Sequence, residues 1–239
     1  MIKQLGIYPD IGSKARDLLY KNYTRQPSIH YHYGCFDWSF HLLCQINDIV
    51  PGLGTGFRFS LPFQRSNRVE LQYLHDFIGI TAGIGLTSKP LLHFSGVVGE
   101  SLFSIGTDLS FDSATGKFAK CNAGFSFNSS ILIASLTLND MADSVIASCY
   151  HPVNPLTNSA IAAEVRHRFL SNETTLAFGA QHAVFPFTLV KARVDTNGKL
   201  GALIQQELLD TFFLTLDGQV DVKAVTRSAK LGLSVAFMH

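Results

Sequence analysis

The sequence predicts an all-β protein, a transmembrane β-barrel of about 15 to 16 strands preceded by a short N-terminal amphipathic helix. Three observations predict this fold. Apolar and polar residues alternate along most of the chain, turn residues divide it at short intervals, and charged residues make up only 15% of the 239 residues. Alternating strands cover one face of a sheet with apolar side chains and the other with polar ones. We expect an N-terminal segment over residues 1–26 and a membrane barrel over residues 27–239.

The N-terminal segment predicts an amphipathic helix from about Tyr8 to Tyr23. Apolar residues recur there at roughly helical spacing, at Ile7, Ile11, Ala15, Leu18 and Leu19. Pro9 and Asp10 suit the first turn of a helix, and Lys21 suits the negative end of the helix dipole. On this pattern alone, an ordinary surface helix has equal standing.

Period-two alternation begins after this segment and continues to the C-terminus. It is clearest over residues 69–73, 80–87, 103–111, 120–127, 161–169, 190–194, 214–221 and 230–237. Turn signals separate the alternating runs, at Ser88-Lys89-Pro90, Thr115-Gly116-Lys117, Asn139-Asp140, Asn154-Pro155, Ser171-Asn172 and Thr196-Asn197-Gly198. The intervals suit strands of about 8 to 11 residues, the length that crosses a bilayer at a tilt.

The composition of the polar faces favours a membrane barrel over a soluble β-protein. A soluble sandwich of this size needs a polar exterior, whereas here the polar faces are rich in Gly, Ser and Thr and poor in charge. Apolar side chains facing lipid and polar side chains facing a water-filled lumen explain both facts. In lipid every backbone polar group must be paired, so we expect the sheet to close. A soluble lipid-binding β-protein is the alternative that this pattern leaves open.

Several other classes of protein are disfavoured. No run of 18 apolar residues predicts a transmembrane helix, and Met1 to Asp10 lack the apolar core of a signal peptide. Lys plus Arg number 19 and Asp plus Glu 18, a balance that disfavours nucleic acid as a partner. The four cysteines lack metal-binding spacing, so no metal site and no cofactor are expected. No nucleophile elbow, HExxH helix or phosphate loop is present, so we expect no enzyme and no catalytic residue.

Particular segments resemble plant mitochondrial porins, the voltage-dependent anion channels of the eukaryotic porin family. Residues 8–21 (YPDIGSKARDLLYK) are similar to the N-terminal helix of that family. Four further segments are similar to its strands, over residues 68–76, 94–99, 133–140 and 202–205. The resemblance implies a channel of the mitochondrial outer membrane that is gated by voltage and passes metabolites and ions, among them ATP, ADP and small anions. It also implies a nineteen-stranded barrel with the helix inside the lumen.

The sequence departs from the family between about Tyr23 and Val50, where about three strands are expected to be missing. Only an irregular segment over residues 28–46 remains, crowded with His30, His32, Cys35, Trp38 and His41. Where the family has Gly-Leu-Lys after a proline, this chain has residues 51–54 (PGLG), so that lysine is lost. The alternative function is therefore a non-conducting barrel scaffold or interaction protein derived from a porin by loss of strands. A protein-import barrel of the same membrane is a third hypothesis, disfavoured because the similarity is to the porin branch.

The candidate functional residues are charged, because fixed charge in a channel lining selects ions. The pore and gating candidates lie on the predicted helix, at Lys14, Arg16 and Lys21, and the resemblance implies that Lys14 and Arg16 set anion preference and gating. The lumen-facing candidates lie on the polar side of their strands, at Lys120, Arg166, Arg168, Lys191, Arg193 and Lys230. They are expected to attract phosphate groups. The simpler explanation for both sets of charged residues is that they only keep the helix surface and the lumen wall soluble in water.

Acidic residues oppose these cations. Asp108, Asp217 and Asp221 are expected to disfavour anions, and Glu164 is expected to pair with Arg166. The near balance of charge predicts weak selectivity. The expected partners are membrane lipids, nucleotides and small anions as permeants, a homo-oligomer and mitochondrial surface proteins.

Overall fold

The computed structural model describes residues 6–21, 23, 40–50, 53–61, 68–87, 89–185, 187–209, 212–222 and 230–237. The chain divides into two compact units, which are treated separately below. The first consists of Met1–Ile11, Tyr31–Asn128 and Ser135–Val145, and the second of Gly12–His30, Ser129–Ala134 and Ile146–His239.

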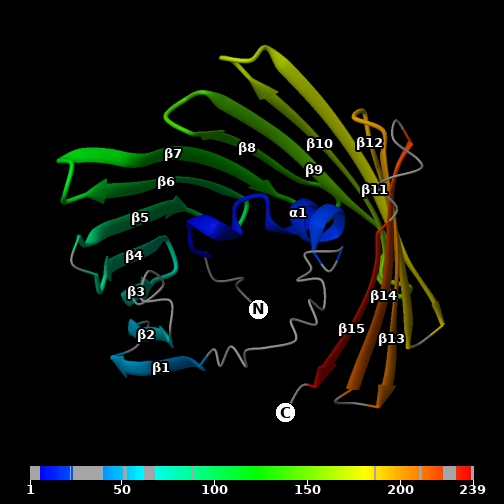
Figure 1. Cartoon of the computed structure of the whole chain (residues 1–239), viewed down its shortest axis with the longest axis horizontal. Helices are drawn as coiled ribbons and strands as arrows, with labels where there is room; N and C mark the ends of the chain where they lie inside the picture. Colours follow the sequence, from blue (N-terminus) through cyan, green and yellow to red (C-terminus); the bar gives the residue numbers. More distant parts are fainter. Residues whose placement is uncertain are drawn as a thin grey trace, which may run out of the picture. The chain divides into compact units, whose positions relative to one another are not determined.

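The first unit is an antiparallel meander with a short 3-10 helix against it. Its elements are η1 (Tyr8–Asp10), β1 (Phe40–Val50), β2 (Leu53–Leu61), β3 (Arg68–Leu74), β4 (Ile78–Gly85), β5 (Leu91–Gly99), β6 (Phe103–Asp112), β7 (Lys117–Asn128) and most of β8 (Ile133–Asn139). From β1 to β7 each strand pairs with the next one along the chain (Figure 1). This connectivity is that of hairpins joined by short turns, which the turn signals predict.

The second unit repeats the same design around an α-helix. Its elements are α1 (Ser13–Tyr20), most of β9 (Ser144–Asn154), β10 (Ser159–Arg168), β11 (Glu173–Phe185), β12 (Thr188–Asp195), β13 (Lys199–Leu209), β14 (Phe212–Asp221) and β15 (Lys230–Phe237). From β10 to β15 each strand is antiparallel to the next. Across the described residues this makes fifteen strands, which confirms the predicted all-β class, strand number and N-terminal helix.

The predicted helix from Tyr8 to Tyr23 is shorter and divided. Gly12 lies between η1 and α1 with a φ of 70°, a left-handed conformation that glycine adopts at little cost and that interrupts an α-helix. Asp10 stabilises the preceding turn, because its Oδ2 accepts a hydrogen bond from the Ile7 amide at 2.9 Å. Lys21 is already extended, so α1 is eight residues long.

One predicted irregular segment proves to be partly regular. Residues 40–46, which include His41, belong to β1, so the expectation of an irregular segment over residues 28–46 is wrong for that part. His41, Gln45 and Asn47 share one phase of a period of two, but Leu43 and Asp48 interrupt it, and this hid the strand. The other residues of that crowded segment, from His30 to Trp38, lie outside the described residues.

The two faces of the strands differ in chemistry and in exposure. We call the face that carries η1 or α1 the inner face and the opposite one the outer face. Outer-face apolar side chains are exposed, as Ile105 at 63% and Leu233 at 65% illustrate. Inner-face polar side chains are buried, with Ser110 at 2% and Glu164 at 6%. This order suits a protein whose exterior meets hydrocarbon, and it confirms the predicted outward orientation of the apolar side.

Neither described helix is both long and apolar enough to span a membrane.

Candidate functional site

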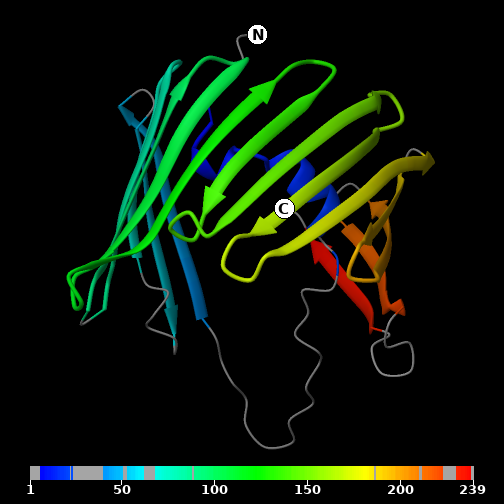
Figure 2. The same ribbon diagram turned by 90° about the horizontal axis from the view of Figure 1, so that it is seen from above.

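The helix α1 packs on the inner face of β10, β11 and β12 (Figures 1 and 2). Its buried side chains, Ala15, Leu18 and Leu19, are 2% exposed or less. They contact small residues of the strands, at Ala160, Ala162 and Ala177. Small side chains leave room for the leucines on an otherwise polar face. Burying a leucine there contributes roughly 1.5–3 kcal/mol to the docking of the helix.

Gly179 belongs to the same surface under α1, which we call the α1 seat and which also contains Ala160, Ala162 and Ala177. A Cβ atom at Gly179 of β11 would lie 2.8 Å from Leu19 Cδ2 and 2.9 Å from Leu18 Cδ2, closer than side-chain carbons approach one another. Gly179 is therefore needed for the close approach of α1 to the strand. The glycines on the polar faces, which the sequence shows as part of the alternation, thus include one that seats the helix.

Two basic residues of β12 hold the carbonyl end of α1. The Arg193 Nη1 donates a hydrogen bond to the Leu19 carbonyl at 3.1 Å. The Lys191 Nζ donates to the Asp17 carbonyl at 3.4 Å. The Asp17 carbonyl also accepts the Lys21 amide at 3.3 Å, whereas Leu19 lies in the last turn, whose carbonyls lack a partner further along the helix. Both carbonyls lie at the negative end of the helix dipole, so cations there are favourable.

Arg193 also meets two aromatic rings of the N-terminal segment. Its guanidinium carbon lies 5.3 Å from the ring centre of Tyr20 and 4.8 Å from that of Tyr23. Both distances fall within the range of cation–π attraction. Arg193 therefore touches α1 through a hydrogen bond and through two rings.

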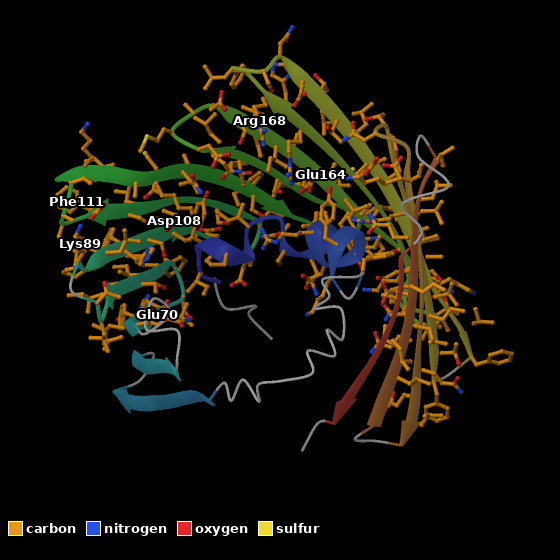
Figure 3. All side chains as sticks on the ribbon, viewed as in Figure 1. Glu70, Lys89, Asp108, Phe111, Glu164 and Arg168 are labelled. Atoms are coloured by element: carbon orange, nitrogen blue, oxygen red, sulfur yellow. The ribbon has the colours of Figure 1, made fainter. Side chains whose placement is uncertain are left out.

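Glu164 of β10 binds Tyr20 in the same helical turn. Its Oε1 accepts a hydrogen bond from the Tyr20 hydroxyl at 2.9 Å and another from Arg166 Nη2 at 3.1 Å. Figure 3 shows Glu164 where β10 passes α1, whereas Arg168 lies further along the strand. The predicted pairing of Glu164 with Arg166 is present, and Tyr20 is a third partner that the pattern did not indicate.

The two tyrosines are kept neutral by their surroundings. Burial, and then the charge of the Glu164 carboxylate, raise the pKa of Tyr20 above its ordinary value. Burial raises the pKa of Tyr23 to about 12, against a smaller opposing effect of Arg193. Both phenols can therefore act as hydrogen-bond donors or ring partners throughout the physiological range of pH.

The polar side of α1 carries the predicted pore and gating candidates. Lys14, Arg16 and Lys21 are exposed, on the side of the helix away from its seat. Lys21 Nζ lies 3.6 Å from Asp17 Oδ2, one helical turn away, in an exposed ion pair.

The first unit has its own polar inner face. Lys120 Nζ of β7 lies 2.5 Å from Asp108 Oδ2 of β6, so this candidate cation is paired. One row away, Ser110 Oγ and His93 Nδ1 are 2.7 Å apart. His93 was not among the predicted residues, although it shares the period-two phase of Ser95 and Val97 on β5.

The six lumen-facing candidates thus have different surroundings. Lys191, Arg193 and Arg166 come together around α1, directly or through Glu164. Lys120 pairs elsewhere, and Arg168 is exposed at the end of β10. Lys230 begins β15, but its side chain is outside the described residues. Within the described residues, no group of three or more His, Cys, Asp and Glu is arranged to hold a metal ion.

Comparison with known proteins agrees with this geometry. Residues 33–232 match the model of the family described as eukaryotic porin. The chain is 45% identical to the mitochondrial outer membrane protein porin of 36 kDa from Solanum tuberosum, over 273 aligned positions that cover 99% of each. It is 41% identical to the mitochondrial outer membrane protein porin 1 from Arabidopsis thaliana, with the same coverage. It is also 38% identical, over 99% of each, to the outer plastidial membrane protein porin from Pisum sativum.

The relatives are longer than this chain. An alignment of 273 positions against 239 residues leaves at least 34 positions without a residue of this chain. That length corresponds to about three membrane-crossing strands with their turns.

Solved structures show the same fold. A mutant of the Rhodopseudomonas blastica porin superposes with a TM-score of 0.58 at 9% identity, covering 83% of this chain and 88% of that one. At such low identity the likeness concerns the fold alone, which is that of a membrane β-barrel.

Proposed function

The chain belongs to the eukaryotic porin family, and from this premise we propose that it forms a voltage-gated channel that passes metabolites and ions across the mitochondrial outer membrane. The observation that carries the proposal is the reversed polarity of the strands, with apolar side chains exposed on the outer face and polar ones on the face that holds α1. Lipid solvates the first face and water the second. Relatives named as mitochondrial outer membrane porins support the location.

The permeants proposed are small anions and nucleotides such as ATP and ADP, with a weak preference for anions. The charges of the inner face support weak selectivity, because several cations there already have partners. Lys120 pairs with Asp108, and Arg166 pairs with Glu164. Lys191 and Arg193 donate hydrogen bonds to carbonyls of α1.

The exposed cations are therefore proposed to contribute most to selectivity. Lys14 and Arg16 lie on the exposed side of α1, and Arg168 is exposed on β10. Lys21 is expected to contribute less, because Asp17 offsets part of its charge. A fixed charge acts on passing ions over about 8–10 Å at physiological ionic strength.

Two further expectations belong to this proposal. The N-terminal segment over residues 1–26, with its helix, is proposed to be distinct from the membrane barrel over residues 27–239. Membrane lipids surround the outer face, and a homo-oligomer and mitochondrial surface proteins are the proposed protein partners.

Planar-bilayer recording of the refolded full chain tests the proposal. We expect a conductance that falls at high voltage of either sign, with anions slightly more permeant than cations. The double variant K14E/R16E should make the pore cation-selective, because it changes four charge units on the exposed side of α1. The matched control K89E/K117E makes the same charge change at two strand ends, and it should leave the permeability ratio close to that of the natural chain.

One result would contradict the proposed channel function. A chain with the far-UV circular dichroism of a folded β-protein but no current at any voltage is not a channel. Retained binding to mitochondrial surface proteins would then select the non-conducting scaffold.

A further inference from the structure

We infer that Arg193 of β12 is a positioning residue that fixes α1 on the inner face, with Glu164 of β10 providing a second contact through the Tyr20 hydroxyl. Only the electrical consequence of this inference rests on the proposed channel function. The physical claim, that two strand residues set the docking of the helix, stands on the contacts alone.

The position of Arg193 in the sheet makes the contact possible. In the register of the strands, Arg193 lies directly between Gly179 of β11 and Gly201 of β13. A Cβ atom at Gly201 would lie 3.1 Å from Arg193 Cγ and 3.1 Å from the Tyr23 ring. The two glycines therefore leave space on both sides of one arginine, and the N-terminal segment occupies that space.

The contacts of Arg193 join three parts of the helix end. Its Nη1 binds the Leu19 carbonyl, and its guanidinium lies against the rings of Tyr20 and Tyr23. Its Nε is buried and has no hydrogen-bond partner among the residues that the structure describes. The aromatic faces are therefore the groups that compensate for the lost hydration of the cation.

Glu164 provides a second polar contact that holds α1, through the hydroxyl of Tyr20. Tyr20 lies against Arg193 with its ring and donates its hydroxyl to Glu164. A helix held only by Leu18 and Leu19 can slide or rotate on a smooth hydrophobic seat. Tyr20 restricts that freedom, because its hydroxyl is held by a directional hydrogen bond to Glu164 of β10 and its ring by a cation–π contact with Arg193 of β12.

A consequence for permeation follows. While α1 is docked, Arg193 donates a hydrogen bond to the Leu19 carbonyl and contacts the rings of Tyr20 and Tyr23. Lys191 donates a hydrogen bond to the Asp17 carbonyl. Movement of the helix away from β12 exposes both cations together. The position of α1 and the charge of the inner wall are therefore coupled.

Access of a small thiol reagent to the buried side of α1 tests the inference. The substitution Ala15→Cys is made in a chain whose own cysteines are replaced by serine, because Ala15 is 2% exposed and contacts the strands. The reagent is a water-soluble methanethiosulfonate, applied to the full chain refolded in detergent. Its rate of reaction reports how often the helix leaves its seat, as exchange rates report local opening.

Four variants in this background give the expected order. Arg193→Gln should raise the rate about tenfold, because it removes a charged hydrogen bond and two cation–π contacts. Arg193→Lys keeps the charge but loses the planar group and should raise it about threefold. Tyr20→Phe keeps the ring and loses the bond to Glu164, and it should also raise the rate about threefold. Lys199→Gln removes an exposed cation of β13 and is the matched control, expected to leave the rate unchanged.

The outcomes separate this inference from the proposed function. Equal rates for Arg193→Gln and Lys199→Gln, with unchanged far-UV circular dichroism, would overturn the role of Arg193. Recovery of protection in Arg193→Lys relative to Arg193→Gln supports a positioning role. If the chain conducts, Arg193→Gln should also move the half-closing voltage, and Lys199→Gln should not. A chain that carries no current contradicts the channel but leaves the thiol result as evidence on the helix.

Discussion

The N-terminal segment contacts the inner face of the sheet in both units, and the two contacts differ in kind. In the first unit Tyr8 and Ile11 form a small buried cluster with Val97 of β5. In the second unit Ala15, Leu18 and Leu19 form a larger one with three alanines of β10 and β11. Both contacts place apolar side chains over positions with small residues. In the first unit, a Cβ at Gly106 would lie 3.1 Å from Tyr8, and one at Gly124 would lie 3.2 Å from Ile11.

The contact of α1 contains directional bonds from the strands as well as apolar packing. Arg193, Lys191 and Glu164 each bond a group of the helical turn that ends at Lys21. A three-residue 3-10 helix such as η1 offers fewer carbonyls and a shorter apolar face than two turns of α-helix. The comparison teaches that the longer apolar face of α1 also brings its C-terminal end within reach of polar strand residues, which fix it by directional bonds.

The largest effect expected to test this comparison comes from shortening a side chain at the centre of the α1 seat. Leu19→Ala removes a fully buried side chain and should weaken docking of α1 by about 2–4 kcal/mol. The reaction rate of the thiol introduced at position 15 should rise about 30-fold or more. Ile11→Ala removes a buried side chain from the other seat and should change that rate by less than about threefold. Equal effects of the two variants would show that both contacts open as one.

The sequence predicts the architecture well because the alternation of apolar and polar residues is a local signal. It gives the class of fold, the approximate strand number and the outward direction of Leu233, and it places Lys191 and Arg193 on the polar side of β12. The strand β1 escaped prediction because Leu43 and Asp48 interrupt its alternation, a pattern that predicts an irregular segment. The break at Gly12 escaped because glycine is also compatible, at some cost, with a continuous helix.

The contacts of the candidate residues could not be predicted from the sequence, for a different reason. Arg193 and the Leu19 carbonyl are 174 positions apart in the chain, and no local period relates them. The pattern therefore shows that Arg193 faces the polar side but not that a helix carbonyl and two tyrosine rings occupy it. Whether a charged residue on the polar face can select ions depends on which groups of the protein already bind it. The sequence pattern does not identify those groups.

Alkaline pH should weaken the polar contacts of α1 while leaving its apolar packing in place. The pKa of Tyr20 and that of Tyr23 are both raised, the latter to about 12. A raised pKa means that the folded state favours the neutral phenol. The stabilisation is fully present below the ordinary value near pH 10 and is lost as the pH rises through the folded-state pKa. Ionised Tyr20 also places a second negative charge beside Glu164.

Spectrophotometric titration measures this effect. Tyrosinate absorbance should show Tyr20 and Tyr23 among the tyrosines that ionise above pH 10. Tyr20→Phe and Tyr23→Phe should each remove one late component. A single transition of all tyrosines near pH 10 would mean that neither phenol is held as the structure has it.

The smallest effect is expected at the exposed end of the same helix. Lys21 and Asp17 form an ion pair whose side chains are 62% and 50% exposed, so solvent screens most of the attraction. Lys21→Ala should therefore cost about 0.3–0.5 kcal/mol, as exposed pairs one turn apart usually do. The thiol at position 15 should react less than about threefold faster than in the parent chain. If Lys21→Ala releases the helix as far as Arg193→Gln does, total charge near the helix end determines docking, and the specific contacts of Arg193 do not.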